Sequence, residues 1–349
     1  MKTSRMLAAL AAALALAMGL SVPLLIAAPG EGSGYHLLKK IPLGGEGGWD
    51  YLTLDAAARR LYITRATHVA VLDADTGATL GELADTPGVH GVALAPELGR
   101  GFTSNGRVSA VTIFDLKTLR ALGQAKTGAN PDAIVYDPAS KRVFTFNGGS
   151  ADATAIDAAS GAVAGTIALG GRPEFAAADG AGRVYVNLED KNELVALDSR
   201  RLVIAARWPL APCTEPAGLA MDTRHQRLFV GCHNQMMAVV DAASGRIVAT
   251  LPIGRGVDAN AFDPDTSLAF SSNGDGTLTV AREESPDKYS VVENVATQRG
   301  ARTMALDTKT HNVFLVTAEF GPPPAPTPEN PRPRPTIVPG SFVVLVFGK

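Results

Sequence analysis

The chain has 349 residues with 32 basic and 34 acidic side chains; only 6% of its residues are aromatic, while glycine (36) and proline (23) are abundant. Short runs of valine, isoleucine and leucine between turn residues are typical of many brief strands and argue against a fold of long helices. The slightly acidic balance also argues against a nucleic-acid-binding protein, whose affinity depends on neutralising phosphates with lysine and arginine.

Residues 1–28 have the layout of a secretory signal peptide. Lys2 and Arg5 precede a long apolar run that ends in small residues, with cleavage expected after Ala28. Removal of this segment would leave 30 basic and 34 acidic residues, a formal charge of −4. The alternative is an uncleaved membrane anchor, because the apolar run is long enough to cross a bilayer. In both cases we expect residues 29–349 in the periplasm or outside the cell.

The segment "KKIPLGGEGGWDYLTLD", residues 39–55, contains a strand at each end. It resembles "ATLPIGRGVDANAFD" at residues 249–263, where the last strand of one repeat leads into the first strand of the next. The folded part is therefore expected to begin with a fourth strand whose three partners come from elsewhere in the chain.

Two series of aspartates mark a repeat of about 42 residues. "AIDAASGAVAGTIALG" at 155–170 returns as "VVDAASGRIVATLPIG" at 239–254, and halving this 84-residue interval recovers the copies between them. Ala95 stands where the second series lacks a member, and seven copies result. The first series is Asp73, Asp115, Asp157, Asp198 and Asp241, and the second is Asp55, Asp137, Asp179, Asp222, Asp263 and Asp307.

Each copy contains four short strands. In residues 133–167, "AIVY" and "RVFTF" flank the turn "DPASK", and "ATAID" and "AVAGTI" flank "AASG". Aspartate, proline, serine and glycine favour turns, and the β-branched residues between them suit a pleated, buried surface. The sequence therefore predicts an all-β, seven-bladed β-propeller with four-stranded antiparallel blades, in which residues 29–349 form a single domain.

Cys213 and Cys232 flank the first hairpin of the fifth copy, "CTEPAGLAMDTRHQRLFVGC". An even cysteine count in an exported protein favours a disulfide between them. Strand register puts Cys232 opposite about Ala217, so Cys213 would have to curl back to reach it. The alternative is a pair of free thiols, and His233 beside Cys232 is either a metal ligand or a solvated loop residue.

"GPPPAPTPENPRPRPTIVPG", residues 321–340, holds nine prolines between the second and third strands of the last blade. Such a segment prefers an extended polyproline conformation and cannot join a sheet. It is either a flap over the channel, a docking strip for a protein partner, or a clamp along the surface. The C-terminal "SFVVLVFGK" is a third strand without a fourth, so we expect it to pair with the N-terminal strand and close the ring.

Several segments resemble the YVTN-repeat, or YncE-like, family of extracytoplasmic β-propellers. Three segments carry the resemblance: "RLYITRATHVAVLDADTG", "RVYVNLEDKNELVALD" and "GLAMDTRHQRLFVGCHN". Two more, "SSNGDGTLTV" and "GARTMALD", resemble characteristic segments of the acidobacterial-type members of the family. It covers residues 36–349 and implies a seven-bladed fold outside the cytoplasm. It implies no particular reaction, because the family as a whole carries no agreed one, although DNA binding is associated with at least one branch.

The repeat brings polar residues from all blades to one mouth of the central channel, because the first strand of a meander begins where the second one ends. Two sets of residues are expected at this mouth. The first set lies five residues before each aspartate of the second series and consists of Asp50, His90, Asp132, Glu174, Ala217, Asp258 and Arg302. The second set lies about ten residues after the same marker and consists of Arg65, Asn105, Asn147, Glu189, Cys232, Asn273 and Thr317.

The leading hypothesis is a binding or interaction protein with a polar ligand funnel at this mouth. A small molecule or peptide would contact Asp50, His90, Asp132, Glu174, Asp258, Arg302, Asn105, Asn147 and Asn273. A divalent metal is a further reading, with Asp132, Glu174 and His90 as candidate ligands. The plain alternative is a solvated ring of polar residues that holds no ligand.

The runner-up hypothesis is a metal-dependent enzyme of the lactonase or lyase sort, with His90 as general acid or base. Against an enzyme, the sequence contains no G-x-S-x-G elbow, no H-E-x-x-H pair and no Walker loop. With only Trp49 and Trp208, it also lacks the tryptophan repeats of quinone-dependent propeller dehydrogenases. A third hypothesis, DNA binding, is disfavoured by the net charge. We expect a monomer.

Overall fold

The structure, a computed structural model, describes residues 32–45, 47–327, 333 and 335–349. Gly32–Lys349 forms one compact unit. The predicted signal peptide lies outside the described residues, as do positions 328–332 and 334 of the proline-rich segment. Among the described residues the helical segments are three 3-10 turns, and none of them is long and apolar enough to cross a membrane. These turns are η1 (Pro96–Leu98), η2 (Gly106–Val108) and η3 (Glu189–Lys191).

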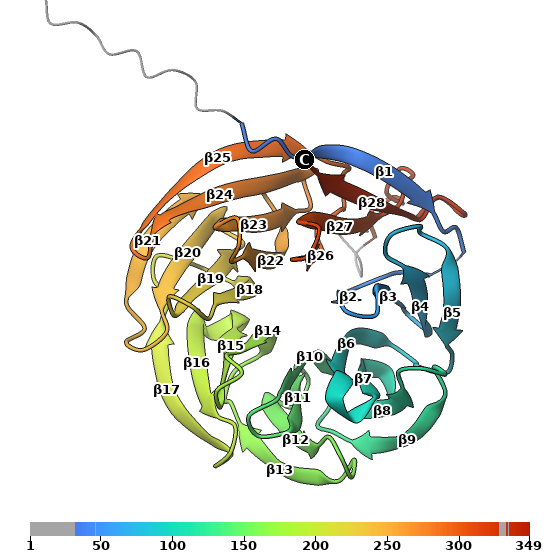
Figure 1. Cartoon of the computed structure of the whole chain (residues 1–349), viewed down its shortest axis with the longest axis vertical. Helices are drawn as coiled ribbons and strands as arrows, with labels where there is room; N and C mark the ends of the chain where they lie inside the picture. The colour runs from blue at the N-terminus through green and yellow to red at the C-terminus, as the bar shows by residue number, and fades with distance from the viewer. Residues whose placement is uncertain (1–31, 46, 328–332, 334) are drawn as a thin grey trace, which may run out of the picture. The chain divides into compact units, whose positions relative to one another are not determined.

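Seven four-stranded antiparallel sheets surround a central axis, with the first strand of each sheet innermost (Figure 1). This confirms the predicted seven-bladed β-propeller. Blade 1 contains β2 (Leu52–Asp55), β3 (Arg60–Arg65), β4 (His68–Asp73) and β5 (Thr79–Leu83). Blade 2 contains β6 (Val89–Ala95), β7 (Arg100–Asn105), β8 (Ala110–Asp115) and β9 (Ala121–Lys126). Blade 3 contains β10 (Pro131–Asp137), β11 (Arg142–Asn147), β12 (Asp152–Asp157) and β13 (Val163–Ala168).

The next three blades follow the same order of strands. Blade 4 contains β14 (Pro173–Ala178), β15 (Arg183–Leu188), β16 (Glu193–Asp198) and β17 (Val203–Pro209). Blade 5 contains β18 (Pro216–Asp222), β19 (Arg227–Cys232), β20 (Met236–Asp241) and β21 (Ile247–Pro252). Blade 6 contains β22 (Val257–Asp263), β23 (Leu268–Asn273), β24 (Thr277–Ser285) and β25 (Lys288–Ala296).

Blade 7 joins the two ends of the described chain. It consists of β26 (Met304–Asp307), β27 (Asn312–Thr317), β28 (Val343–Gly348) and, as its outer strand, β1 (His36–Pro42). Strand β1 pairs antiparallel with β28 from His36↔Gly348 to Pro42↔Val343, and Figure 1 shows the two side by side. The predicted ring closure is confirmed. Strand β1 pairs with β28, so the C-terminal strand has a neighbour on both sides.

One apolar cluster lies between each pair of neighbouring blades, which accounts for the β-branched and aromatic residues on both faces of the inner strands. Between blades 5 and 6, for example, the rings of Phe229 and Phe262 stack with centroids 4.9 Å apart, and Tyr289 meets Phe229 edge-on at 5.7 Å. The core is thus distributed around the ring, so each blade depends on both neighbours.

The repeated aspartates of the first series close the hairpin between the third and fourth strands of their blades. Oδ1 of Asp73 accepts the backbone N–H of Thr76 at 2.7 Å and its hydroxyl at 2.8 Å. Gly77 follows with φ +78°, a conformation that glycine adopts without strain. The same turn recurs at Asp157 with Ser160 and Gly161. A side chain that holds its own turn explains why the repeat conserves its spacing inside one chain.

Candidate functional site

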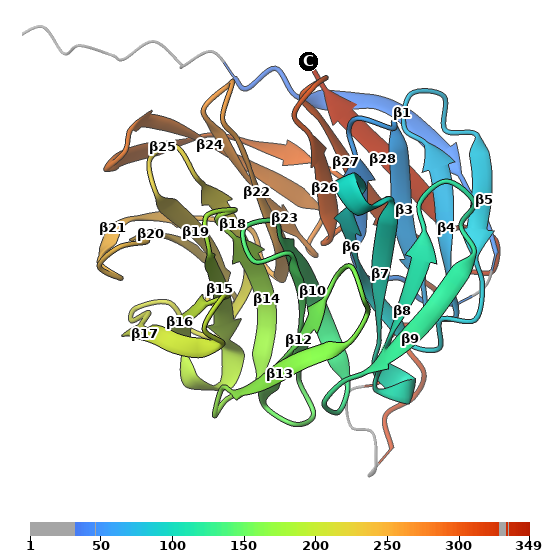
Figure 2. The same cartoon turned by 60° about the horizontal axis from the view of Figure 1, so that its bottom comes forward.

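The first predicted set of residues lies at the start of the inner strands, at one end of the ring (Figure 2). In blades 2 to 6 the pairing of the first strand with the second shifts register at this place. Such bulges redirect side chains and are frequent beside functional sites. A proline precedes the bulge in three of these blades, where it can begin a strand without breaking a ladder. The bulge residues from the predicted set are His90, Asp132, Glu174, Ala217 and Asp258.

The remaining two polar members, Asp50 and Arg302, lie two residues before β2 and β26. Direct contacts connect members from different blades: His90 contacts Asp50 and Asp132, and Arg302 contacts Asp258. The prediction that repeat phasing brings these residues together thus agrees with the geometry. We call the six polar members the carboxylate rim: Asp50, His90, Asp132, Glu174, Asp258 and Arg302.

His90 lies between two carboxylates of the rim. Its Nδ1 is 2.6 Å from Oδ2 of Asp50 and 3.5 Å from Oδ1 of Asp132. The imidazole lies over Gly106, where a Cβ would approach Nε2 to 2.7 Å, so the ring position requires a residue without a side chain there. Burial lowers the pKa of His90, but the hydrogen bond to Asp50 and the nearby carboxylates outweigh it and raise the pKa to about 9. The imidazole is therefore a cation at neutral pH.

The other rim carboxylates resist ionisation. Burial, reinforced by Asp50 and Glu174, raises the pKa of Asp258 to about 7 even though Nε of Arg302 lies 3.3 Å from its Oδ2. Burial and mutual repulsion also raise the pKa values of Asp132 and Glu174 well above their usual range. Oδ1 of Asp132 is buried and has no hydrogen-bond partner among the residues that the structure describes. The rim therefore contains more acidic groups than its own two cations, His90 and Arg302, can pair with.

Tyr51 and Phe175 form the floor beneath the rim. Their rings come from blades 1 and 4, on opposite sides of the ring centre, and meet edge-on with centroids 4.9 Å apart. Burial, followed by the charges of Asp132 and the other rim carboxylates, raises the pKa of Tyr51 well above the usual range. The phenol is therefore neutral beneath the carboxylates. The contact between the two rings narrows the channel at this level.

A cavity of about 450 Å³ lies beside the rim. Trp49 and Phe320, with ring centroids 6.2 Å apart, form its aromatic part, and Arg302 links it to the rim. Gly300 is required here, because its φ is +82° and a Cβ would approach the Phe320 ring to 2.7 Å. The cavity adds an apolar compartment to a charged one. It is lined by Gly48, Trp49, Gly274, Arg299, Gly300, Arg302, Phe320, Pro335 and Ile337.

The described ends of the proline-rich segment form one wall of this cavity. Phe320 and Ile337 make an isolated antiparallel bridge, flanked by hydrogen bonds from Gly321 N–H to the carbonyl of Thr336 and from Val338 N–H to that of Glu319, both 2.8 Å. The segment therefore leaves and returns at the same place beside the rim. Its position agrees with the predicted face of the ring.

The second predicted set includes Asn105, Asn147 and Asn273, to which the sequence assigns a ligand-binding role, and their surroundings argue against that role. All three side chains are fully buried inside their blades. Nδ2 of Asn147 donates to Asp152 at 2.6 Å and to Thr154 at 3.0 Å. Asn105 donates in the same way to Thr112, and Asn273 to Thr277 and Thr279. These amides connect the second and third strands, and their donors are used inside the blade.

The sequence contains a signal for this structural role that spacing alone missed. A hydroxyl residue precedes each asparagine by two positions and another follows six or seven positions later, as in Thr103, Asn105 and Thr112. The other members of the second set are also occupied elsewhere. Arg65 lies over the Phe342 ring at 3.8 Å, Glu189 pairs with Arg172, and the hydroxyl of Thr317 donates to the Arg299 carbonyl.

Cys213 and Cys232 form a disulfide in the structure, and both are buried. The register places Cys232 opposite Pro216, one residue from the expected Ala217, and a turn in which Cys213 N–H donates to the carbonyl of Leu210 brings the first cysteine back. His233 pairs instead with Glu215 at 3.4 Å. Within the described part of the chain, His233 belongs to no cluster of three metal-ligating side chains.

Comparison with known proteins shows the fold alone. No protein-family model and no curated protein matches this sequence. Among solved structures, U3-55K is similar with a TM-score of 0.72 at 8% identity, over 89% of this chain and 98% of that one. The WD40 repeats of RRP9 give a TM-score of 0.73 at 8% identity, over 90% and 97% of the chains. A chain of the mitotic checkpoint complex gives 0.69 at 16% identity, over 89% and 95%.

Proposed function

We propose that this chain is an exported, YncE-like binding protein whose carboxylate rim takes the cationic group of a small molecule or peptide. It has the seven-bladed architecture of WD40 propellers, a fold typical of interaction and scaffold proteins. In this proposal the apolar part of the ligand lies against Trp49 and Phe320 in the neighbouring cavity. The observation that carries the proposal is the convergence of rim carboxylates, with Asp258 buried and Asp132 and Glu174 half-buried, whose pKa values are raised toward neutrality.

The charge balance of the rim favours a positively charged ligand. Four carboxylates face two cations, and each cation already has a carboxylate partner: His90 with Asp50, and Arg302 with Asp258. Glu174 has no such partner on the rim, and Oδ1 of Asp132 accepts no hydrogen bond within the described residues. An ammonium or guanidinium group placed between Asp132 and Glu174 would satisfy both and displace the protons that they hold near neutral pH.

Two features support export. Residues 1–28 have the composition of a signal peptide, and a disulfide joins the only two cysteines of the chain. Disulfides persist in extracytoplasmic compartments and are rare in a reducing cytosol. The mature N-terminus is testable directly: after expression with the full sequence in a bacterium, N-terminal sequencing of the periplasmic fraction should begin near position 29. Protein that keeps residues 1–28 in the membrane fraction would support the anchored alternative.

A thermal-shift experiment tests the binding proposal. Wild-type protein is heated at pH 8 with alkyl amines, aromatic amines and short lysine- or arginine-containing peptides, beside their neutral acetylated or citrulline counterparts. A ligand that binds the native state raises its melting temperature. The variant Asp132→Asn/Glu174→Gln should lose the response. A matched double variant of exposed carboxylates, Glu82→Gln/Asp85→Asn, should keep it.

If the ligand raises the melting temperature of both double variants equally, the rim is rejected as the binding site. A response to anionic compounds alone would reject the class of ligand. The affinity for a cationic probe should also rise between pH 6 and pH 8, because the pKa of Asp258 is about 7 and its neighbours are raised in the same direction. An affinity that is independent of pH over this range would contradict the role given to the rim carboxylates.

A metal-dependent enzyme of the lactonase or lyase sort is a second candidate function, favoured by one observation. Asp50, His90 and Asp132 each offer one ligand atom, and these atoms lie within 4.8 Å of one another. Oxygen and imidazole ligands of this kind fit a divalent cation, which when bound would polarise a substrate carbonyl. His90 would then be a ligand, and Glu174 would be the group with a pKa suited to moving a proton near neutral pH. Elemental analysis of wild type and His90→Ala tests this candidate. If wild type contains no metal that His90→Ala loses, the enzyme hypothesis is rejected.

Two partner predictions stay open in this proposal. The proline-rich segment, residues 321–340, is a candidate docking strip for a protein partner, and its described ends stand beside the ligand cavity. DNA binding has little support from an acidic rim, and it predicts an affinity that falls steeply with salt concentration. Retention on a DNA column at low salt with such a slope would revive it.

A further inference from the structure

A second cluster of metal-ligating side chains lies at the opposite end of the blades, between blades 5 and 6. Asp222 ends β18, His225 lies in the turn that follows, and Glu283 lies on β24 of the next blade. Nδ1 of His225 is 2.8 Å from Oδ2 of Asp222 and 3.2 Å from Oε1 of Glu283. One ligand atom from each residue lies within 4.8 Å of the other two. The cluster therefore connects two blades through three side chains.

The two carboxylates are buried and the imidazole is accessible. The side chains of Asp222 and Glu283 are 1% and 3% exposed, whereas that of His225 is 41% exposed. Oε2 of Glu283 is buried and has no hydrogen-bond partner among the described residues. An ionised oxygen left unpaired in a buried site is costly, so this atom indicates a ligand that supplies positive charge.

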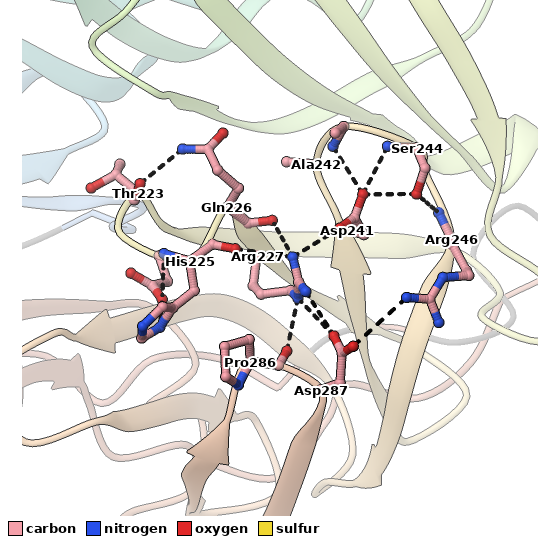
Figure 3. Close-up of polar contacts among 12 residues, drawn as sticks. Thr223, His225, Gln226, Arg227, Asp241, Ala242, Ser244, Arg246, Pro286 and Asp287 are labelled. Atoms are coloured by element: carbon pink, nitrogen blue, oxygen red, sulfur yellow. Dashed lines mark hydrogen bonds and ion pairs between the residues drawn. The ribbon is translucent and has the colours of Figure 1, made fainter.

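The cation already present nearby is engaged elsewhere. Figure 3 shows the guanidinium of Arg227, which bonds Asp241 at 2.9 Å and Asp287 at 2.7 Å, as well as the carbonyl of Pro286. With two carboxylate partners of its own, Arg227 does not neutralise Asp222 and Glu283. Asp222 and Glu283 offer two carboxylates and His225 offers one imidazole, a set of ligands that suits a divalent ion.

The spacing of the three ligand atoms fits one small cation. Zinc binds histidine nitrogen and carboxylate oxygen at about 2.0–2.2 Å, and two ligands on a tetrahedral centre are then about 3.3 Å apart. The distances of 2.8 and 3.2 Å from Nδ1 of His225 are close to this value. The exposed side of His225 leaves a fourth position for water and a route of entry.

A local extension of blade 6 produces this arrangement. Strand β24 has nine residues, while the corresponding strands β8, β12, β16 and β20 have six each. Glu283 lies in the added part, where its Oε1 also accepts a hydrogen bond from the Tyr289 hydroxyl at 3.1 Å. The extension thus brings a carboxylate from one blade to the turn of its neighbour, and Tyr289 fixes its orientation.

We propose that Asp222, His225 and Glu283 bind one divalent transition-metal ion of the zinc class and that this ion links blades 5 and 6. One imidazole with two carboxylates favours zinc over calcium or magnesium, which prefer all-oxygen sites. The site is separate from the carboxylate rim, so it does not depend on the proposed ligand-binding function. Its role is to hold two blades together.

Zinc titration of the purified, metal-stripped protein tests the proposal. Bound zinc per chain is measured by equilibrium dialysis for wild type, His225→Ala and Glu283→Gln, with His311→Ala as the matched control. His311 also pairs with a buried aspartate, Asp263, at 2.7 Å, but it belongs to no three-residue cluster among the described residues. We expect His225→Ala and Glu283→Gln each to lose one zinc equivalent and His311→Ala to lose none.

The variant His90→Ala separates this site from the carboxylate rim. If the rim also binds zinc, His90→Ala removes a different equivalent and leaves the one that depends on His225. Wild-type protein should gain melting temperature with zinc in a saturating manner, and His225→Ala should lose that gain. The proposal is overturned if wild type binds no zinc, if zinc loss occurs only in His90→Ala, or if calcium binds these residues in preference to zinc.

Discussion

The two ends of the propeller use the same carboxylate chemistry in opposite ways. At the end where the third strands finish, Asp73, Asp157 and their equivalents accept hydrogen bonds from their own turns, which lower their pKa values. At the other end, burial raises the pKa values of Asp132, Glu174 and Asp258. Turn carboxylates are stabilised as anions by the fold itself, and rim carboxylates are not.

The difference teaches how to separate structural from functional acids in a repeat protein. A turn aspartate recurs in register because each blade needs the same turn, and its lone pairs are satisfied locally. The rim has no such repetition, since the equivalent position is aspartate in some blades, histidine, glutamate or arginine in others, and alanine in blade 5, which contributes no member to the rim. Unsatisfied, non-repeating polar groups that converge from different blades indicate a site for something outside the chain.

The largest effect is expected from a buried aspartate at the turn end. Asp307 is fully buried and bonds Arg59 of the next blade at 2.7 Å. Replacing it with alanine removes one of the two carboxylates that pair with the Arg59 guanidinium, which keeps Asp75, and also removes the bonds from Lys309 N–H and the Thr310 hydroxyl. The free energy of unfolding should fall by about 3 kcal/mol. Urea denaturation measures the change, and Asp55→Ala, at the same place in blade 1 but less buried, is the comparison. An equal, small effect in both variants would contradict the importance of burial at this end.

The next largest effect concerns the buried asparagines at the ends of the second strands. Asn147→Ala removes the amide that bonds Asp152 and Thr154 and leaves the Thr154 hydroxyl without it, so we expect a loss of about 1–3 kcal/mol. If Asn147 were instead a ligand contact, the variant would bind its cationic probe more weakly at unchanged stability. Urea denaturation and the thermal-shift assay, run on the same variant, distinguish the two outcomes.

The stability of the whole protein should fall as pH rises. The pKa of Asp258 increases from its ordinary 3.8 to about 7 on folding, so the native state binds more protons than the unfolded state in this interval and loses stability as they dissociate. The pKa of His90 rises from 6.5 to about 9, so its contribution is present below 6.5 and is lost as pH rises through 9. The free energy of unfolding, measured by urea denaturation between pH 5 and 9, should decline by on the order of 1 kcal/mol per pH unit. A rise over this range would contradict the raised values.

The smallest effect has the opposite sign from the first. Asp132→Asn removes a half-buried carboxylate whose buried Oδ1 accepts no hydrogen bond within the described residues, so at pH 8 it should stabilise the fold by on the order of 1 kcal/mol. The same change should give a smaller gain at pH 5.5, where the wild-type carboxyl is protonated. A loss of stability at both pH values would show that Asp132 stabilises the fold, as the turn aspartates do.

The sequence was sufficient for the fold, and the repeat phase was sufficient to locate the positions at the starts of the inner strands. The aspartate spacing sets the phase of every blade, and counting five residues back reaches the start of each inner strand, so His90 and Asp132 were predicted at a common rim. Counting ten residues forward reached Asn147, but the direction of a side chain at a strand end depends on packing, and this one points into its blade.

Other parts of both sites depend on contacts between distant blades. Tyr51 and Phe175 meet across the ring, and Glu283 reaches Asp222 only because β24 is extended. Neither contact leaves a local signature, since each depends on the closed geometry of seven blades. The bulges that aim the rim residues were also invisible to spacing, although the prolines before Asp132 and Glu174 mark two of them.

Titration of the carboxyl carbons by NMR tests the contrast between the two ends most directly. With ¹³C-labelled protein and assignments made from the variants Asp132→Asn, Glu174→Gln and Asp258→Asn, the rim signals should titrate near neutral pH, with Asp258 at about 7. The signals of Asp73 and Asp157 should titrate below their ordinary range. If the rim carboxyls titrate in the acidic range together with the turn carboxyls, their pKa values are not raised and the proposed cation site is contradicted.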